Sequence, residues 1–582
     1  MWHSGSAKVR SREYVLLLHV LHKCTKSAWN LLGHTLENSH LGADFSRIKS
    51  WVEECSESHS RCRQSDKPLP TRVIDISGAP VTVQLVVTSG KHSPYAALSY
   101  CWGRSQAVVT TSETIASHLE GISCSALPKT LQDAVITAKS LGFTYLWVDA
   151  LCIQQDNIED KEREMALMQQ IFQNASITIV AARASDSTQG FLNINWGLAP
   201  TTVLPIIQYL EPSKSENRIG SIGLYLEEID RVREPLHTRA WTLQEVLLAP
   251  RLLVYGRNRL VWKCLQGEHV DDETDWNGYC AIAGLTTIRF GRRGEIIRPP
   301  LSTQSADIVA YTSEPERQPE LFRIWKRVIM DYSSRHLTNP MDKLPALSGI
   351  ATYFRDAMED TYLAGLWEKQ LVYQLSWIPK DKATRQGVWR APSWSWVSVD
   401  GSIVFYADKF LHCDKMAELR SCKVTPAMQT APLSRVISGS LCLHGHLKAN
   451  VRDFGGRLPF ARPADETDGL FGKIILDADE ENPDGEMDEA EEIEEIDELS
   501  MSARSNIESR RSSHLGIYWC LMFLRCFKQA SSYGSYEVIE YVWGFALSRT
   551  RGGTFRRVGY FIGNAECTHW FQKSEKRTIV IK

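Results

Sequence analysis

The sequence predicts an α/β fold for the first half of the chain, with a mainly parallel sheet flanked by helices. An apolar strand at Tyr95–Tyr100 is followed by a helix that begins at Pro128 and by a second buried strand at Tyr145–Val148. An amphipathic helix at Glu159–Gln173 then leads to a third strand at Ser176–Ala181. Strands that alternate with helices in this way pair in parallel through right-handed crossovers.

Local signals support both helices. Pro128 suits the first helical turn, where its missing N–H costs nothing, and Gly142 suits the turn that ends the first helix. The apolar face of the first helix is made by Leu131, Val135, Ala138 and Leu141, and that of the second by Met165, Met168 and Phe172. The strand Ser176–Ala181 is rich in β-branched residues, which favour extended backbone.

Polar and aromatic residues follow two of these strands directly. Tyr100-Cys101-Trp102-Gly103 comes after the first strand and Asp149-Ala150-Leu151-Cys152 after the second. Functional groups of parallel sheets gather at the carboxyl ends of the strands. Further along, Trp241–Leu248 is expected to form a short helix and Leu252–Tyr255 another strand. The sequence therefore predicts a functional edge at the strand ends.

The composition is that of a largely folded protein without strong net charge. Of 582 residues, 43% are apolar and 23% charged, and the net charge of -3 does not favour nucleic-acid binding. The 14 cysteines form no dense framework, which favours reduced thiols and a cytoplasmic location. No apolar stretch reaches the roughly 20 residues of a membrane span. Tyr14–Leu21 is expected to form a short helix rather than a signal peptide.

Changes in composition divide the chain into five segments. These are a lead-in with a helix and a short strand (1–90), the α/β domain (91–260), a mixed helical and Trp-rich region (261–465), an acidic disordered linker (466–515) and a strand-rich end (516–582). The second half is thus a mixed α+β region. In the linker, the like charges of Asp477–Glu498 oppose folding. Near the end, Gly552-Gly553 indicates a hairpin.

One group of residues in the lead-in resembles metal ligands. Cys55, His59 and Cys62 lie at positions i, i+4 and i+7 of a helix predicted at Ser46–Arg63, and so share one face. A structural zinc site needs four ligands, and no fourth residue follows nearby. The sequence therefore favours two thiols and a histidine packed in the core, and no metal site is predicted.

Three blocks of the sequence resemble the heterokaryon incompatibility (HET) domain family of filamentous fungi. The first is Tyr95–Gly103, the second runs over Leu127–Asp156 and ends with Glu164–Ala175, and the third is Arg239–Glu245. The segment 91–260 is then a HET domain. The resemblance implies a role in non-self recognition at cell fusion, leading to regulated cell death.

The same region resembles, more distantly, the Toll/interleukin-1 receptor (TIR) domain. TIR domains also open with a strand like Tyr95–Tyr100 and carry a Trp-x-x-x-Glu motif, matched here by Trp241 and Glu245. Some TIR domains hydrolyse NAD with that glutamate, so the resemblance implies that Glu245 is catalytic. A carboxylate near the ribose stabilises the oxocarbenium-like state in which nicotinamide departs. The alternative is that Glu245 caps a helix or pairs with Arg239.

Four other residues are candidates for substrate binding, each with a structural alternative. Trp241 lies one helical turn from Glu245 and could stack on a base, or could belong to the core. Trp102 and Gly103 could shape a pocket, or could form a tight turn. Asp149 could orient substrate, or could bond backbone amides. Cys152 is expected to be a buried thiol rather than a nucleophile, because no paired histidine accompanies it.

Three interpretations follow from these features, and one of them is a diverged family member with neither of the two functions described next. The chain could be a cell-death effector with NAD as a substrate rather than a bound cofactor. It could instead be a non-enzymatic module that signals by self-association, as many TIR domains do. In either case we expect a homo-oligomer through the HET domain or an unknown sensor or partner protein, with no nucleic-acid partner and no membrane span.

Overall fold

The computed structural model describes residues 9–10, 14–21, 45–62, 67–103, 108–192, 202–205, 221–228, 234–256, 260–270, 289–290, 296–297, 317–381, 383–405, 412–452, 472–478, 516–532 and 535–582. These residues belong to two compact units, Met1–Ala310 and Tyr311–Lys582. Among them, no helix is both long and apolar enough to cross a membrane.

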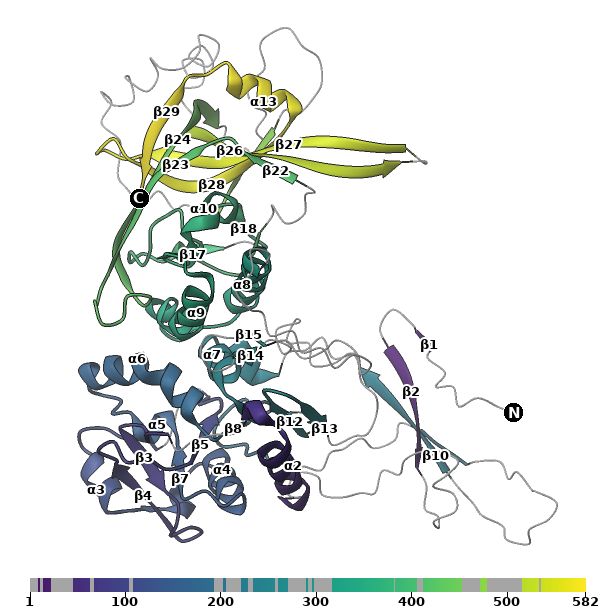
Figure 1. Ribbon diagram of the computed structural model, residues 1–582, viewed down its shortest axis with the longest axis vertical. Coiled ribbons are helices and arrows are strands. Elements are labelled where there is room, and N and C mark those ends of the chain that lie inside the picture. Colours follow the sequence, from purple (N-terminus) through teal and green to yellow (C-terminus); the bar gives the residue numbers. More distant parts are fainter. Residues whose placement is uncertain are drawn as a thin grey trace, which may run out of the picture. The chain divides into compact units, whose positions relative to one another are not determined.

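The first unit is built on a nine-stranded mixed sheet (Figure 1). Its strands in sheet order are β13 (Glu268–Val270), β12 (Leu260–Cys264), β11 (Arg251–Tyr255), β8 (Ile177–Val180), β5 (Tyr95–Ser99), β7 (Tyr145–Trp147), β3 (Arg72–Asp75), β4 (Thr82–Val87) and β6 (Ile122–Ser123). Only β11, β8, β5 and β7 pair in parallel. The outer strands pair antiparallel, in part because β3–β4 and β11–β12 are joined by connections too short for a crossover. The prediction of a mainly parallel sheet is therefore confirmed for the four central strands, whereas the sheet as a whole is mixed.

Helices cover both faces of this sheet. They are α2 (Phe45–Ser58), α3 (Ile115–Glu120), α4 (Lys129–Ser140), α5 (Asp149–Cys152), α6 (Ile158–Asn174) and α7 (Trp241–Leu248), with short 3-10 turns η2 (Ser60–Cys62), η3 (Cys124–Ala126) and η4 (Pro235–Thr238). The chain steps from β5 to β7 through α4, and then back across β5 to β8 through α6. Right-handed crossovers in opposite directions place α4 and α6 on opposite faces, and Figure 1 shows α6 and α7 on the face opposite α4.

The central elements agree closely with the sequence prediction. β5 and β7 are neighbours and pair in parallel, and α7 has the predicted bounds. The segment that was expected to lead into the domain contributes β3 and β4 to the same sheet.

The prediction for Tyr14–Leu21 is wrong. This segment is strand β2 and not a helix, because all eight of its residues pair with β10 (Ser221–Glu228). An apolar run of this length cannot be assigned to helix or strand by periodicity alone. Strands β2 and β10 belong to a separate four-stranded sheet that also contains β1 (Val9–Arg10) and β9 (Thr202–Pro205). A further pair of strands is formed by β14 (Arg289–Phe290) and β15 (Ile296–Ile297).

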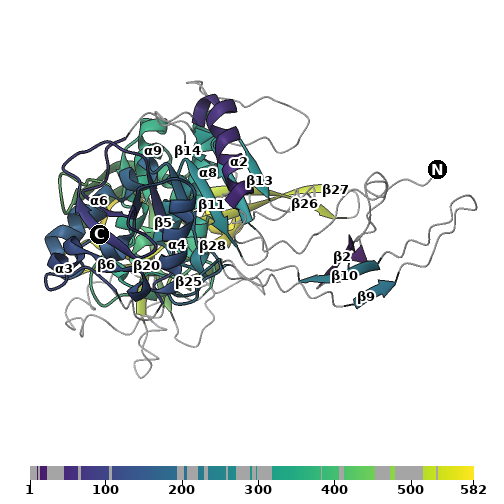
Figure 2. The ribbon, with the colours of Figure 1, turned by 90° about the horizontal axis from the view of Figure 1, so that it is seen from below.

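The second unit combines a helical, Trp-rich layer with an eight-stranded sheet. The sheet runs β22 (His412–Lys415), β26 (Gly516–Ser532), β27 (Ser535–Arg549), β28 (Phe555–Asn564), β29 (Lys576–Ile581), β24 (Val436–Arg452) and β23 (Glu418–Pro426), with β25 (Gly472–Leu476) on β28. Because β24 also pairs with β26, the strands from β26 to β24 close into a ring. The β26–β27 hairpin extends beyond this ring in both views (Figures 1 and 2).

The Trp-rich layer is held together by edge-to-face aromatic contacts. Its helices are α8 (Arg317–Ser333), α9 (Pro345–Met358) and α10 (Leu371–Gln374), and α13 (Ala565–Gln572) packs on the sheet. Short pieces join them: η6 (Pro340–Asp342), β16 (Tyr362–Leu363), β17 (Leu366–Trp367), η7 (Glu368–Gln370), β18 (Trp377–Pro379), β19 (Thr384–Arg385), η8 (Trp396–Ser398), β20 (Val399–Asp400) and β21 (Ile403–Phe405). At its centre the ring centroids of Trp325 and Trp367 lie 5.3 Å apart.

One buried ion pair connects the parts of the second unit. The Arg557 Nε donates to Asp477 Oδ2 at 2.8 Å, and Arg557 also bonds the carbonyl oxygens of Leu375 and Trp377. Its guanidinium carbon lies 3.5 Å from the centre of the Trp377 ring. Both charged side chains are completely buried. The pair therefore links β28 to the Trp-rich layer and to the end of β25.

This pair also corrects the predicted acidic linker at 466–515. Gly472–Leu476 forms strand β25, and Asp477 is buried because Arg557 compensates its charge. Residues 466–471 and 479–515 lie outside the described residues.

Replacement of Arg557 by Met should destabilise the second unit by about 3–5 kcal/mol, because Asp477 would be left as an uncompensated buried charge. The half-buried neighbour Arg556 is the matched control, and Arg556→Met should cost less than about 1 kcal/mol. Chemical denaturation of both variants, followed by the fluorescence of the buried tryptophans, measures the difference. Equal stability of the two variants would contradict this account of the pair.

Candidate functional site

The topology singles out the carboxyl end of β5. The chain leaves β5 toward β7 on one side and later places β8 on the other side. In open α/β sheets, ligands bind in the crevice at such a switch point. The residues Ser99-Tyr100-Cys101-Trp102-Gly103 occupy this end, as the sequence predicted for the segment after the first strand.

Glu245 is brought to this strand by α7. Five of the eight residues of the helix are apolar, and seven, Thr242 to Leu248, are buried. The helix therefore packs flat on β5 and β8, and Glu245 is carried inward with it. Only 7% of Glu245 is exposed. Its Oε2 accepts a hydrogen bond of 2.5 Å from the Ser99 hydroxyl, which fixes the carboxylate against the last residue of β5.

Asp149 and Trp102 form a second hydrogen bond at the same edge. The indole Nε1 of Trp102 donates to Asp149 Oδ2 at 2.9 Å, and the Ala150 N–H donates to Oδ1 at 2.7 Å. Burial raises the pKa of Asp149, although the charge of Arg239 and the hydrogen bonds from Ala150, Trp102 and Tyr100 oppose this shift. The bond from the Ala150 N–H agrees with the structural role considered for Asp149, which was to bond backbone amides. The bond from Trp102 links Asp149 to the end of β5.

Tyr100 and Arg239 lie between these two carboxylates. Burial, followed by the negative charge of Asp149, raises the pKa of the Tyr100 phenol well above its usual value, and Glu245 adds to this effect. Arg239 Nη1 donates to the carbonyl oxygen of Tyr100. Its positive charge acts on Asp149 and on Cys101. The end of β5 is therefore surrounded by two carboxylates, a phenol and a guanidinium.

Gly103 is required by the backbone. Its φ is +83°, and a Cβ at this position would lie 2.5 Å from the Cβ of Asp186. Any larger residue would be strained and would push the loop after β8 away. Of the two roles considered for Gly103, a pocket wall or a tight turn, the geometry agrees with the tight turn.

The positions of Trp241 and Cys152 give less support to a functional role. Trp241 is half-buried and packs against the main hydrophobic core. Cys152 is buried, and burial raises the pKa of its thiol to about 12, so that it is neutral at physiological pH. A neutral, enclosed thiol is a poor nucleophile, in agreement with the sequence interpretation.

The structure thus gathers Glu245, Trp102 and Asp149 around one strand end and places Gly103 in the adjoining turn. Sequence reasoning did not single out Ser99, placed Tyr100 only within the segment after the first strand, and considered Arg239 only as a partner of Glu245, although all three stand within the motifs that carry the family resemblance. The signal available was a serine at the end of an otherwise apolar, buried strand, since a buried hydroxyl needs a hydrogen-bond partner. Away from this edge, Cys55, His59, Cys62 and Cys264 come together as potential metal ligands.

The raised pKa of Asp149 leads to a prediction about stability and pH. A carboxyl with a folded-state pKa above its usual 3.8 stabilises the fold at low pH and loses this contribution as pH rises through the folded pKa. Asp149→Asn removes the titration, so its melting temperature relative to wild type should increase between about pH 4 and pH 8.

Asp186→Asn serves as a control of opposite sign. Hydrogen bonds from Thr188 lower the pKa of Asp186, so this carboxylate stabilises the fold above its usual pKa and loses that contribution in acid. The relative melting temperature of Asp186→Asn should therefore not rise with pH. A flat or falling profile for Asp149→Asn would contradict the burial of its charge.

Comparison with known proteins identifies one part of the chain. Residues 95–245 match the model of the family described as Heterokaryon incompatibility protein (HET). No curated protein and no solved structure matches the chain. The matched segment begins with the first residue of β5 and ends at Glu245, so it contains the whole constellation described above. Residues 95–245 are therefore identified as a heterokaryon incompatibility (HET) domain.

Proposed function

We propose that this protein is an effector in fungal non-self recognition and regulated cell death, and that its HET domain hydrolyses NAD at the carboxyl end of β5. The observation that carries the proposal is the hydrogen bond between Ser99 and Glu245, which holds a carboxylate at the topological switch point of the sheet. The likeness to TIR domains in the motif Trp241-x-x-x-Glu245 supplies the reaction class.

The reaction needs little from the protein besides electrostatic stabilisation. The bond between the nicotinamide nitrogen and the ribose C1′ breaks, and its electron pair neutralises the pyridinium nitrogen. The ribose becomes an oxocarbenium-like cation, which water attacks to give ADP-ribose, nicotinamide and one proton. A fixed carboxylate beside the ribose stabilises the positive charge where it develops.

Each residue at the edge has a part in this proposal. Glu245 is the catalytic carboxylate, and Ser99 is a positioning residue that holds it. Trp102, Gly103, Asp149 and Trp241 bind the nucleotide. Trp102 and Trp241 are both half-buried, so each presents part of an aromatic surface on which a ring could stack. Because only 7% of Glu245 is exposed, nucleotide binding must be accompanied by movement of the residues that cover it.

A second candidate function is signalling by self-association, and one observation favours it. Val81 directly precedes β4 and Val87 is its last residue, and the two are 71% and 54% exposed. An exposed apolar side chain at each end of a strand near the edge of the sheet offers contacts that a second protein could cover. In this case Glu245 is a buried structural group, and a homo-oligomer or an unknown sensor protein carries the signal.

The decisive measurement is nicotinamide release from NAD by the purified full chain and by Glu245→Gln. Glutamine keeps the shape of the side chain and its acceptor for Ser99 but removes the charge, so turnover should fall by about 100-fold or more. The melting temperature should stay within a few degrees of wild type. Killing of fungal cells by the expressed protein should be lost in parallel.

Glu159→Gln is the matched control, because it removes the same charge from an exposed position of the same domain. It should turn over NAD like wild type. If Glu245→Gln keeps its fold and still kills, hydrolysis at Glu245 is not the signal, and self-association is favoured. If Glu245→Gln unfolds while the wild type shows no turnover, the bond to Ser99 is structural.

A further inference from the structure

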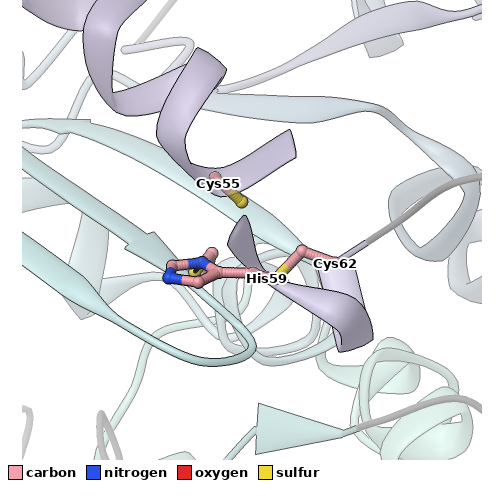
Figure 3. A group of neighbouring side chains, drawn as sticks. Cys55, His59 and Cys62 are labelled. Carbon is pink, nitrogen blue, oxygen red and sulfur yellow. Dashed lines mark hydrogen bonds between the residues drawn. The ribbon is translucent and has the colours of Figure 1, made fainter. Parts of the chain in front are cut away.

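Four side chains with metal-binding atoms meet beside the sheet of the first unit, away from the end of β5. Cys55 lies in the last turn of α2, His59 follows this helix, Cys62 ends η2, and Cys264 ends β12. The predicted helix at Ser46–Arg63 is broken after Ser58, and this break turns His59 and Cys62 back toward Cys55. Figure 3 shows these three side chains extending into the same space between α2 and η2.

Cys264 is the fourth residue that could not be recognised from the sequence. It lies 205 positions after His59, and its Sγ is 3.3 Å from the His59 Nδ1. One potential ligand atom from each of the four residues lies within 4.8 Å of every other. Zinc–sulfur bonds of about 2.3 Å in a tetrahedron place the sulfurs about 3.8 Å apart. The four atoms are therefore close enough for one tetrahedral ion.

Hydrogen-bond donors surround the sulfurs in the manner of a second coordination shell. The backbone N–H groups of Gln266 and Gly267 donate to Cys264 Sγ at 3.4 and 3.2 Å. Arg251 Nε donates to Cys55 Sγ at 3.3 Å. Donors of this kind stabilise thiolates, which are the form that binds metal.

The turn that carries Cys62 is held by Arg251 and by the loop that follows Cys264. Arg251 Nη2 donates to the Cys62 carbonyl oxygen at 2.6 Å, and the Arg61 N–H donates to Gln266 Oε1 at 2.6 Å. The turn that carries Cys62 is thus fastened both to β11 and to the loop after Cys264.

We propose that Cys55, His59, Cys62 and Cys264 form a structural zinc site that fastens α2 and η2 to β12. Three thiolates and an imidazole are a ligand set typical of zinc. With four protein ligands the coordination sphere is closed, so the ion stabilises the fold and takes no part in catalysis. A disulfide would use only two of the three thiols and would leave the third thiol and His59 without a common role. The zinc site does not depend on the proposed NAD hydrolysis.

The experiment measures metal content in the full chain. Wild type, purified under reducing conditions without chelator, should contain about one zinc per chain by plasma mass spectrometry. Cys264→Ser should contain at least tenfold less. The matched control is Cys124→Ser, which changes a half-buried cysteine of the same unit outside the cluster and should keep its zinc.

Cobalt provides a test that does not depend on the folding of a variant. When wild type is stripped of metal with a chelator and titrated with Co²⁺, it should develop thiolate-to-cobalt charge-transfer bands and the visible bands of a tetrahedral site. The bands should saturate at one equivalent and disappear when zinc is added.

Three results would overturn the proposal. The first is wild type that contains less than about a tenth of a zinc per chain and gives no cobalt bands after reduction. The second is Cys264→Ser that is folded and retains full zinc. The third is a disulfide between any two of the three cysteines in freshly purified protein, detected as a mass lower by two hydrogens.

Discussion

The pairing of β5 with both β7 and β8 is the constraint on which the rest of the first unit depends. With parallel neighbours on both sides, β5 is fully buried, and only its carboxyl end is free to carry chemistry. The connection from β5 to β7 brings α4 to one face, and the return from β7 across β5 to β8 brings α6 to the other, where α7 packs beside it. Glu245 reaches Ser99 only because α7 lies on the face toward which this serine points.

The part of the fold that depends on local pattern could be predicted from the sequence. The alternation of short apolar strands with amphipathic helices identified the parallel centre, and α7 has the predicted bounds. Strand β2 could not be predicted in this way, because its antiparallel partner β10 is far from it in the chain. The same reason applies to the site. Asp149 and Glu245 stand in recognisable motifs, whereas the pairing of Ser99 with Glu245 spans 146 residues and leaves no local pattern.

Two charged arrangements in the molecule illustrate the difference between a structural and a functional role. Arg557 and Asp477 are both completely buried and compensate each other's charge, and backbone carbonyl oxygens accept further hydrogen bonds from Arg557. At the end of β5 the enclosure is incomplete, because Asp149, Trp102 and Arg239 are half-buried, although Glu245 is buried. Partly covered charges can exchange water for a ligand at little cost, whereas a sealed pair cannot. The HET domain thus keeps Asp149 and Arg239 partly accessible at the edge where its parallel strands end.

The position of Arg251 has a consequence for synthesis on the ribosome. This residue bonds the Cys55 sulfur, the Cys62 carbonyl oxygen and the Ser176 carbonyl oxygen, and so joins α2 and η2 to the centre of the sheet. The segment 45–62 leaves the ribosome long before Arg251 and Cys264 exist; His59 and Cys264 are 205 residues apart. At about 5–20 residues per second the apolar face of α2 waits for roughly 10–40 s before its partners are made. During this interval Ile48 and Trp51, which the finished protein buries, lack the partners that this later part of the chain supplies.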